Sequence, residues 1–174
     1  HSLAAYLKRE RAVPDGKIKV VGQGADLELF ANKYVEPDDL KHLSRPRLVW
    51  VGVVAKADAE LMRAALRALP GEAGSLVIIG PPASWALELA AENRRVYCLG
   101  PRPASEVPAY LKHCDVGLML YNRAVDKRVY EGQNPLKLYE MAAAGLPIVS
   151  TPHAEYRFHP PPVIVAEDSS QVTQ

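Results

Sequence analysis

The chain has 174 residues, of which 48% are hydrophobic and 24% are charged, and its formal net charge is +1. These values fit one soluble globular domain with a substantial core. They give no reason to expect a nucleic-acid or acidic-membrane surface, and no apolar run approaches the ~20 residues that a membrane span needs. Cys98 and Cys114 show neither metal-ligand nor CxxC spacing. We therefore expect both to be reduced core residues of a cytosolic protein.

The first residues, His1-Ser2-Leu3, lack an initiator methionine and lie inside an amphipathic segment. We expect a fragment of a longer protein, and the alternative is a tag remnant ahead of a native start. Further along, apolar runs alternate with helical patterns. Helices are expected from Asp58 to about Leu69, over 83–92 and 105–113, and after Asn134. Strands are expected at 17–21, 48–54, 76–79, 95–99, 116–120, 148–150 and 163–165.

Strands separated by single helices predict βαβ units. The fold class is therefore α/β, a Rossmann-like parallel sheet with helices on both faces, formed by residues 1–174 as a single domain. Ligands of such sheets bind at the carboxyl ends of the strands. The segments that follow Val54, Ile79, Leu99 and Leu120 are therefore expected to form the walls of a site.

Two short motifs are better explained by structure than by chemistry. Gly22-x-Gly24 lacks the third glycine of a dinucleotide fingerprint, so we interpret it as a glycine turn. Asp58-Ala-Glu60 lies where a helix needs a cap and favours acids in its first turn, so capping is preferred to metal binding. No cluster has metal-ligand spacing, and the histidines have no neighbouring serine or cysteine nucleophile.

A mildly basic loop, residues 121–134, joins a strand to the next helix. Its length and position favour ligand contact, although a solvated surface loop is the alternative for any single cation. Its cationic and aromatic residues are Tyr121, Arg123, Lys127, Arg128 and Tyr130, against the acids Asp126 and Glu131.

The segment 134–151 is the most informative. Asn134 is expected to cap a helix whose first residue is Pro135, and Gly145 to end it. Lys137 and Glu140 are three residues apart and so share a helical face. They could be an exposed ion pair, or Lys137 could bind a diphosphate at the helix N-terminus and Glu140 the ribose hydroxyls.

Residues 135–149, Pro-Leu-Lys-Leu-Tyr-Glu-x-x-Ala-Ala-Gly-x-Pro-Ile-Val, resemble the donor-binding domain of group 1 glycosyltransferases of the GT-B fold. Other segments follow the order of that family across nearly the whole chain. These are 21–26 with Phe30, then 48–52, 76–80, 96–100 and 114–118.

The resemblance implies a nucleotide-sugar donor, with UDP preferred, and no bound metal. It implies that Glu140 binds the ribose and that Gly100-Pro101-Arg102 lies beside the base. Lys137 and the amides of the helix start at Leu136 would face the diphosphate. Tyr121 would lie next to the nucleotide, and Gly52, which ends the valine-glycine strand, belongs to the same site.

Two positions depart from the family. Gly132 stands eight residues before Glu140, where the large retaining group has a glutamate, and Glu131 is one residue too early. Val53 replaces the usual arginine after the valine-glycine strand, so Lys137, Arg123 or Lys56 would supply charge for the diphosphate. The pattern resembles the branch of the xanthan glucuronosyltransferase, and it leaves retention or inversion open.

The expected function is that of the C-terminal, donor-binding half of a bacterial glycosyltransferase. It would be cytoplasmic, with possible association with the inner membrane face, and would transfer a sugar to a polysaccharide or lipid-linked glycan. The catalytic base is expected in the missing N-terminal domain. The alternatives are a nucleotide-sugar epimerase of the same architecture and a non-catalytic partner-binding module.

Overall fold

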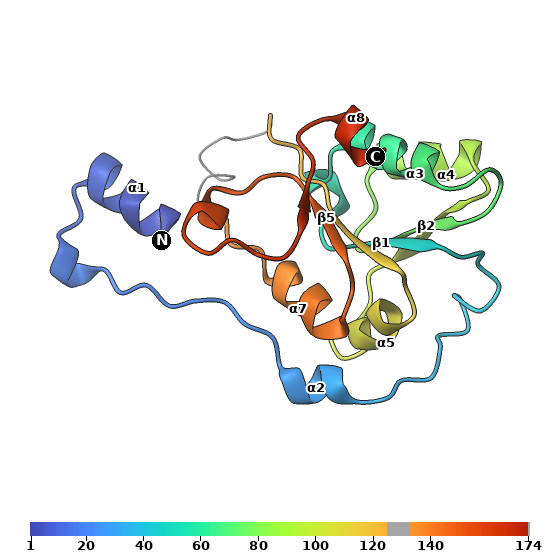
Figure 1. Ribbon diagram of the computed structural model, residues 1–174, viewed down its shortest axis with the longest axis horizontal. Coiled ribbons are helices and arrows are strands. Elements are labelled where there is room, and N and C mark those ends of the chain that lie inside the picture. Colours follow the sequence, from blue (N-terminus) through green and yellow to red (C-terminus); the bar gives the residue numbers. More distant parts are fainter. Residues whose placement is uncertain (125–132, 174) are drawn as a thin grey trace.

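A six-stranded parallel sheet forms the centre of the computed structural model, which describes residues 1–124 and 133–173 (Figure 1). Its order is β3-β2-β1-β4-β5-β6, and every neighbouring pair is parallel. The predicted fold class is confirmed. The strands are β1 (Arg47–Val51), β2 (Ser75–Ile79), β3 (Val96–Gly100), β4 (Val116–Met119), β5 (Ile148–Ser150) and β6 (Ile164–Val165).

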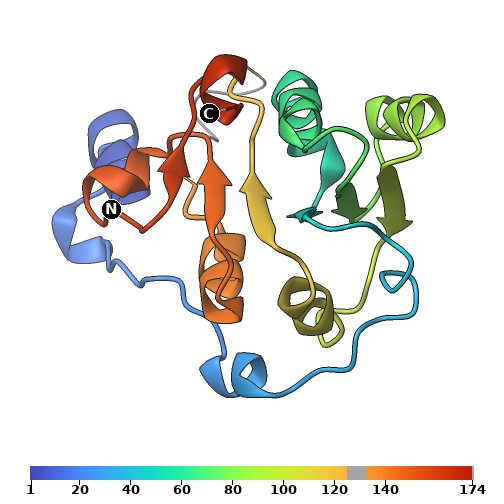
Figure 2. The ribbon, with the colours of Figure 1, turned by 45° about the vertical axis from the view of Figure 1, so that its right-hand side comes forward.

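Helices cover both faces of this sheet (Figures 1 and 2). One face carries α3 (Ala59–Ala68), α4 (Ser84–Glu92) and α8 (Ser169–Val172). The other carries α2 (Leu27–Ala31), α5 (Val107–Lys112) and α7 (Leu136–Ala144). The remaining described helical elements are α1 (Ser2–Arg11) and the short 3₁₀ turns η1 (Asp15–Lys17), η2 (Val54–Lys56) and η3 (Ala154–Arg157). None of the helices in the described part of the chain has the length and apolar character to cross a membrane.

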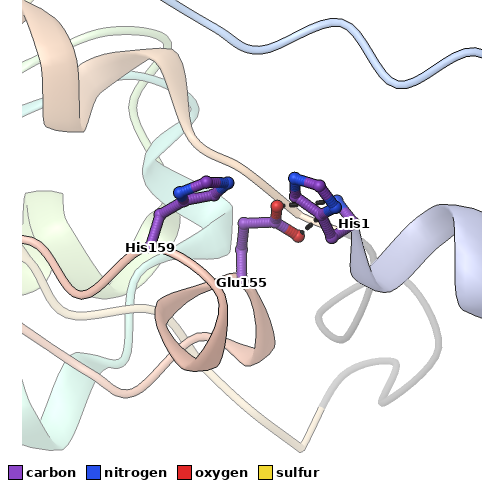
Figure 3. Close-up of side chains that lie close together, drawn as sticks. All are labelled: His1, Glu155 and His159. Atoms are coloured by element: carbon purple, nitrogen blue, oxygen red, sulfur yellow. Dashed lines mark hydrogen bonds and ion pairs between the residues drawn. The ribbon is translucent and has the colours of Figure 1, made fainter.

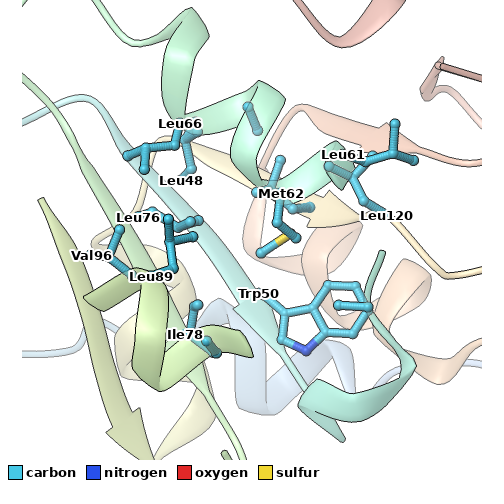
Figure 4. Packing of buried hydrophobic residues seen from close by; sticks show 14 of the residues in the cluster. Leu48, Trp50, Leu61, Met62, Leu66, Leu76, Ile78, Leu89, Val96 and Leu120 are labelled. Atoms are coloured by element: carbon cyan, nitrogen blue, oxygen red, sulfur yellow. The ribbon is translucent and has the colours of Figure 1, made fainter. Parts of the chain in front are cut away.

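The core consists of two apolar clusters, one on each face. All five residues of β1 are buried, as expected for a central strand covered on both sides. Because strand side chains alternate, Leu48 and Trp50 join the cluster under α3 and α4, and Val49 and Val51 join the other (Figure 4). Both cysteines are free thiols, and burial raises the pKa of Cys114 to about 12.

Two of the expected helix ends are confirmed and one is wrong. Asp58 caps α3, accepting hydrogen bonds from the N–H groups of Glu60 and Leu61 at 3.0 and 3.1 Å. Gly145 ends α7 in the left-handed conformation, with φ at 82°. Asn134 does not cap α7, and Pro135 is not its first residue, because Pro135 itself takes the cap position ahead of Leu136. The Asn134 side-chain oxygen instead accepts a hydrogen bond from the Tyr139 hydroxyl at 3.1 Å.

The strand expected at 17–21 is also wrong. Residues 15–17 form η1, and the chain beyond it is extended without strand pairing until α2. A strand needs a neighbour for its backbone groups, and this segment runs away from the sheet (Figure 1), with Val21 79% exposed. Gly22 and Gly24 lie in this segment without forming the expected turn, ahead of the five-residue helix α2, which Asp26 caps.

Candidate functional site

The strand order reverses between β1 and β4. From β1 the chain proceeds outward through β2 and β3, and β4, β5 and β6 then extend the sheet on the other side. Helices on opposite faces diverge at such a point and leave a crevice at the carboxyl ends of the two central strands. The structure has a pocket of about 230 Å³ at this crevice.

Four segments from different parts of the chain form this switch-point pocket. They are the end of β1, the η2 turn, the second residue beyond β4 and residues 133–137 at the start of α7. The lining residues are Trp50, Val51, Gly52, Val53, Lys56, Tyr121, Gln133, Asn134, Pro135 and Lys137. The pocket therefore unites Gly52, Tyr121 and Lys137, three residues that the sequence placed in one site.

The start of α7 gives the pocket its electrostatic character. The first backbone N–H groups of a helix have no intrahelical acceptor and carry a partial positive charge. Leu136 is the first residue of α7, Lys137 is the second, and Lys56 lies across the pocket. This arrangement suits an anion such as a phosphate.

Lys137 and Glu140 form an ion pair, with Nζ and Oε2 2.5 Å apart. Their side chains are only 26% and 18% exposed, so the pair is better shielded than an ordinary surface pair. Lys137 lines the pocket, whereas Glu140 stands one turn further along the helix and does not. The geometry allows both sequence interpretations, since a ligand could engage the two groups together.

A tight backbone contact fixes the glycine turn at the end of β1. The Gly52 N–H donates to the carbonyl of Ile79 at 2.9 Å, and a Cβ at Gly80 would lie 1.9 Å from the Gly52 carbonyl oxygen. Gly52 itself has a φ of 140°, and the space where a Cβ would be is open. A ligand can therefore approach the backbone at Gly52 closely.

Tyr121 lies where the loop after β1 meets the loop after β4. It forms an isolated bridge with Ala57, and the Asn122 N–H donates to the carbonyl of Lys56 at 2.9 Å. Its ring packs edge-on against Trp50 and His153, with centroids 5.0 and 5.3 Å away. The position of Tyr121 in the pocket wall is thus held from both sides.

Gly100 and Arg102 lie at the end of β3, outside the lining of the switch-point pocket. The Arg102 guanidinium is engaged locally, donating to Asp39 Oδ2 at 2.7 Å, to the Tyr110 hydroxyl at 2.8 Å and to the Leu99 carbonyl at 2.6 Å. These contacts fasten the turn after β3 to α5 and to the segment before β1. The structure therefore does not bring Arg102 together with Lys137, and its expected place beside a base stays a prediction.

Arg123 belongs to a different hollow. It lines a pocket of about 920 Å³ with Arg157 and Glu167, and its guanidinium lies 3.8 Å from the Glu167 carboxylate. The rest of the basic loop lies outside the described residues. This covers the predictions for Lys127, Arg128 and Tyr130 and the position of Glu131 and Gly132.

Sequence reasoning missed two features. Trp50 is part of the pocket wall, and a lone tryptophan in an aliphatic strand was the signal for it. His1, Glu155 and His159 also lie together, with candidate metal-ligand atoms within 4.8 Å of one another (Figure 3). Glu155 accepts from the N-terminal ammonium at 2.6 Å and from the Ser2 N–H and hydroxyl at 2.8 Å. Burial raises the pKa of Glu155, but these bonds outweigh it and hold the pKa low.

The fold and pocket place the protein in the Rossmann-like α/β class with a crevice at the strand switch point. Within that class, the chain belongs to the family of group 1 glycosyl transferases, whose sequence model matches residues 45–168. The expected family is confirmed. The chain is 31% identical over 142 residues to TuaH of Bacillus subtilis (strain 168), which carries the name of a teichuronic acid biosynthesis glycosyltransferase.

Solved structures of low sequence identity share the fold. Sucrose-phosphate synthase from Thermosynechococcus elongatus matches 99% of the chain with a TM-score of 0.70 and 18% identity. HepE of Anabaena, in complex with UDP-glucose, matches 94% with a TM-score of 0.67 and 14% identity. The chain spans 34% of TuaH, 45% of the synthase and 48% of HepE.

Proposed function

We propose that this chain is the C-terminal, donor-binding half of a bacterial glycosyltransferase and that its donor is a UDP-sugar. The observation that carries the proposal is the switch-point pocket, which combines an open glycine turn, a helix start and two lysines. The family supports it, and so does HepE, a structural neighbour solved with UDP-glucose that this chain covers over 48% of its length.

In this proposal the pocket holds the diphosphate. Lys137, the amides at Leu136 and the backbone at Gly52 face its oxygens, and Lys56 adds positive charge, whereas Arg123 lies in another hollow. Glu140 binds the ribose, Tyr121 lies beside the nucleotide, and the turn at Gly100–Arg102 is next to the base.

The chemistry then follows from charge. An acceptor hydroxyl attacks the anomeric carbon while the diphosphate leaves, so negative charge grows on the leaving phosphate. Helix amides and Lys137 would stabilise that developing charge more strongly than the ground state. We propose that the reaction needs no bound metal and that a second, N-terminal domain supplies the acceptor site and the base. The acceptor would be a polysaccharide or lipid-linked glycan at the cytoplasmic side of the membrane, a choice to which the name of TuaH lends support.

Calorimetric titration with UDP, GDP and ADP tests the proposal. We expect micromolar binding of one nucleotide, UDP, unchanged by EDTA. Glu140→Ala should weaken it about tenfold or more, because a hydrogen bond to a charged group is lost. Glu88→Ala, the same change on an exposed residue of another nine-residue helix, is the matched control and should bind as the wild type does.

The Glu140 variant separates the two interpretations of the ion pair. If Glu140 only neutralises Lys137, its removal frees that cation, and UDP should bind equally well or more tightly. No binding of any nucleotide to the wild type would contradict the proposal and favour the partner-binding module.

A further inference from the structure

The Trp50 indole carries a buried hydrogen-bond donor that has no acceptor within residues 1–124 and 133–173. The residue is 2% exposed, and its Nε1 has no hydrogen-bond partner among the described residues. In the view of Figure 4 the ring nitrogen lies on the edge of the indole away from Met62 and Leu120. Buried tryptophan N–H groups normally find an acceptor.

Packing alone does not explain a tryptophan at this position. The other residues of β1 on the apolar faces are leucine and valine, and the ring contributes to the core through its carbon atoms. Burying an unpaired N–H is unfavourable. A phenylalanine could provide the same aromatic contact with Tyr121 without that burial. The N–H therefore points to an acceptor outside the residues that the structure describes.

The surroundings of Trp50 indicate the chemistry of that acceptor. It lines the same pocket as Lys56 and Lys137 and is two residues from the open turn at Gly52. An indole N–H can only donate, and a phosphate oxygen can only accept. An uncharged acceptor would gain nothing from the two lysines and the helix start, whereas a phosphate oxygen is favoured by all of them.

We propose that Trp50 is a binding residue of the donor site and that its indole N–H donates to an oxygen of the diphosphate. This inference rests on the proposed function. It adds to the donor site a residue that favours ligands with a diphosphate over ligands without one. The nitrogen is shielded from solvent in this structure, so the contact forms with a small shift of the pocket wall.

The test uses the two indole N–H signals of the ¹⁵N-labelled chain, one from Trp50 and one from Trp85 on α4. The Trp50→Phe variant assigns them. On saturation with UDP, the Trp50 signal should move downfield as its hydrogen bond forms, and the Trp85 signal should stay in place. This measurement needs only the wild type once the signals are assigned, and Trp85→Phe assigns them equally well if Trp50→Phe fails to fold.

Affinity provides the second readout. Trp50→Phe should bind UDP about five- to tenfold more weakly, as expected for one lost hydrogen bond, and pyrophosphate should lose a similar factor. Uridine, which has no phosphate, should bind both proteins alike, and Trp85→Phe should bind UDP as the wild type does.

The outcomes separate this inference from the proposed function. If the wild type binds UDP but Trp50→Phe binds it equally well, or if the Trp50 signal does not move, Trp50 does not contact the ligand and the inference is overturned. If UDP does not bind the wild type at all, the proposed function fails first.

Discussion

Lys137 and Glu140 show how a surface motif becomes a candidate site. Three residues apart on a helix, such a pair usually stabilises little. Here α7 begins at the strand switch point, so Lys137 faces a pocket, and the two side chains are only 26% and 18% exposed. Because both charges are partly desolvated, removing one of them would leave the other unpaired, which is unfavourable. Each charge therefore needs either the other residue or a ligand as its partner.

His153 should make the stability of the fold depend on pH. Burial, helped by the positive charge of Arg123, lowers the pKa of His153 to about 4, and its ring lies between Tyr121 and Tyr156. The ordinary pKa of histidine is about 6.5. Between about pH 6.5 and about pH 4, His153 is therefore protonated in the unfolded chain and neutral in the folded chain. Stability should therefore fall as the pH is lowered through this range and level off below it.

The expected loss between pH 7 and pH 5 is about 2 kcal/mol, measured by urea unfolding. His153→Gln removes the titrating group and should flatten this slope, whatever its effect at pH 7. His42→Gln, at an exposed position, should keep the slope of the wild type. An unchanged slope in His153→Gln would show that the proton uptake occurs elsewhere.

At the scale of elements, the backbone just beyond β1 packs closely against the backbone just beyond β2. A Cβ at Gly80 would meet the Gly52 carbonyl oxygen at 1.9 Å, and the φ of Gly80 is 141°, a conformation that other residues rarely adopt. Gly80→Ala should therefore lower the free energy of unfolding by about 3 kcal/mol or more, as backbone strain and overpacking add.

Urea unfolding would measure this loss, with Gly22→Ala as the matched control. No atom lies within 4 Å of a Cβ at Gly22, so its change should stay within about 0.5 kcal/mol. If Gly80→Ala unfolds at the urea concentration of the wild type, the two strand ends are not in close contact.

Elements whose signals are local were predictable. The apolar run of β1, the cap at Asp58 and the stop at Gly145 depend on residues within a few positions, and all three are confirmed. The predictions for Asn134 and for the segment 17–21 were wrong because both depend on contacts with residues outside the local pattern. A tyrosine hydroxyl engages the Asn134 oxygen, and no neighbouring strand pairs with 17–21 in the described structure.

At the scale of the whole molecule, the chain spans 45% of the synthase and 48% of HepE. We therefore expect nucleotide binding and sugar transfer to depend on different parts of the protein. We expect the chain by itself to bind UDP and to transfer no sugar, because the acceptor site and base belong to the proposed second domain. Release of UDP from UDP-glucose, UDP-glucuronic acid and UDP-N-acetylglucosamine, with and without glycan acceptors, checks this. The same chain extended toward its N-terminus is the control and should be active. Transfer by the chain alone would place the base within these 174 residues.

The sequence by itself determined the fold class and the family, and it predicted the edge of the sheet where a site should lie. Periodicity, caps and glycines act over short distances, so they can be inferred without the fold. Only the tertiary structure decided which side chains meet. It placed β1 beside β4, which brings Gly52, Tyr121 and Lys137 to one pocket together with Trp50. It also tied Arg102 to Asp39, 63 residues away, through packing that no local pattern records.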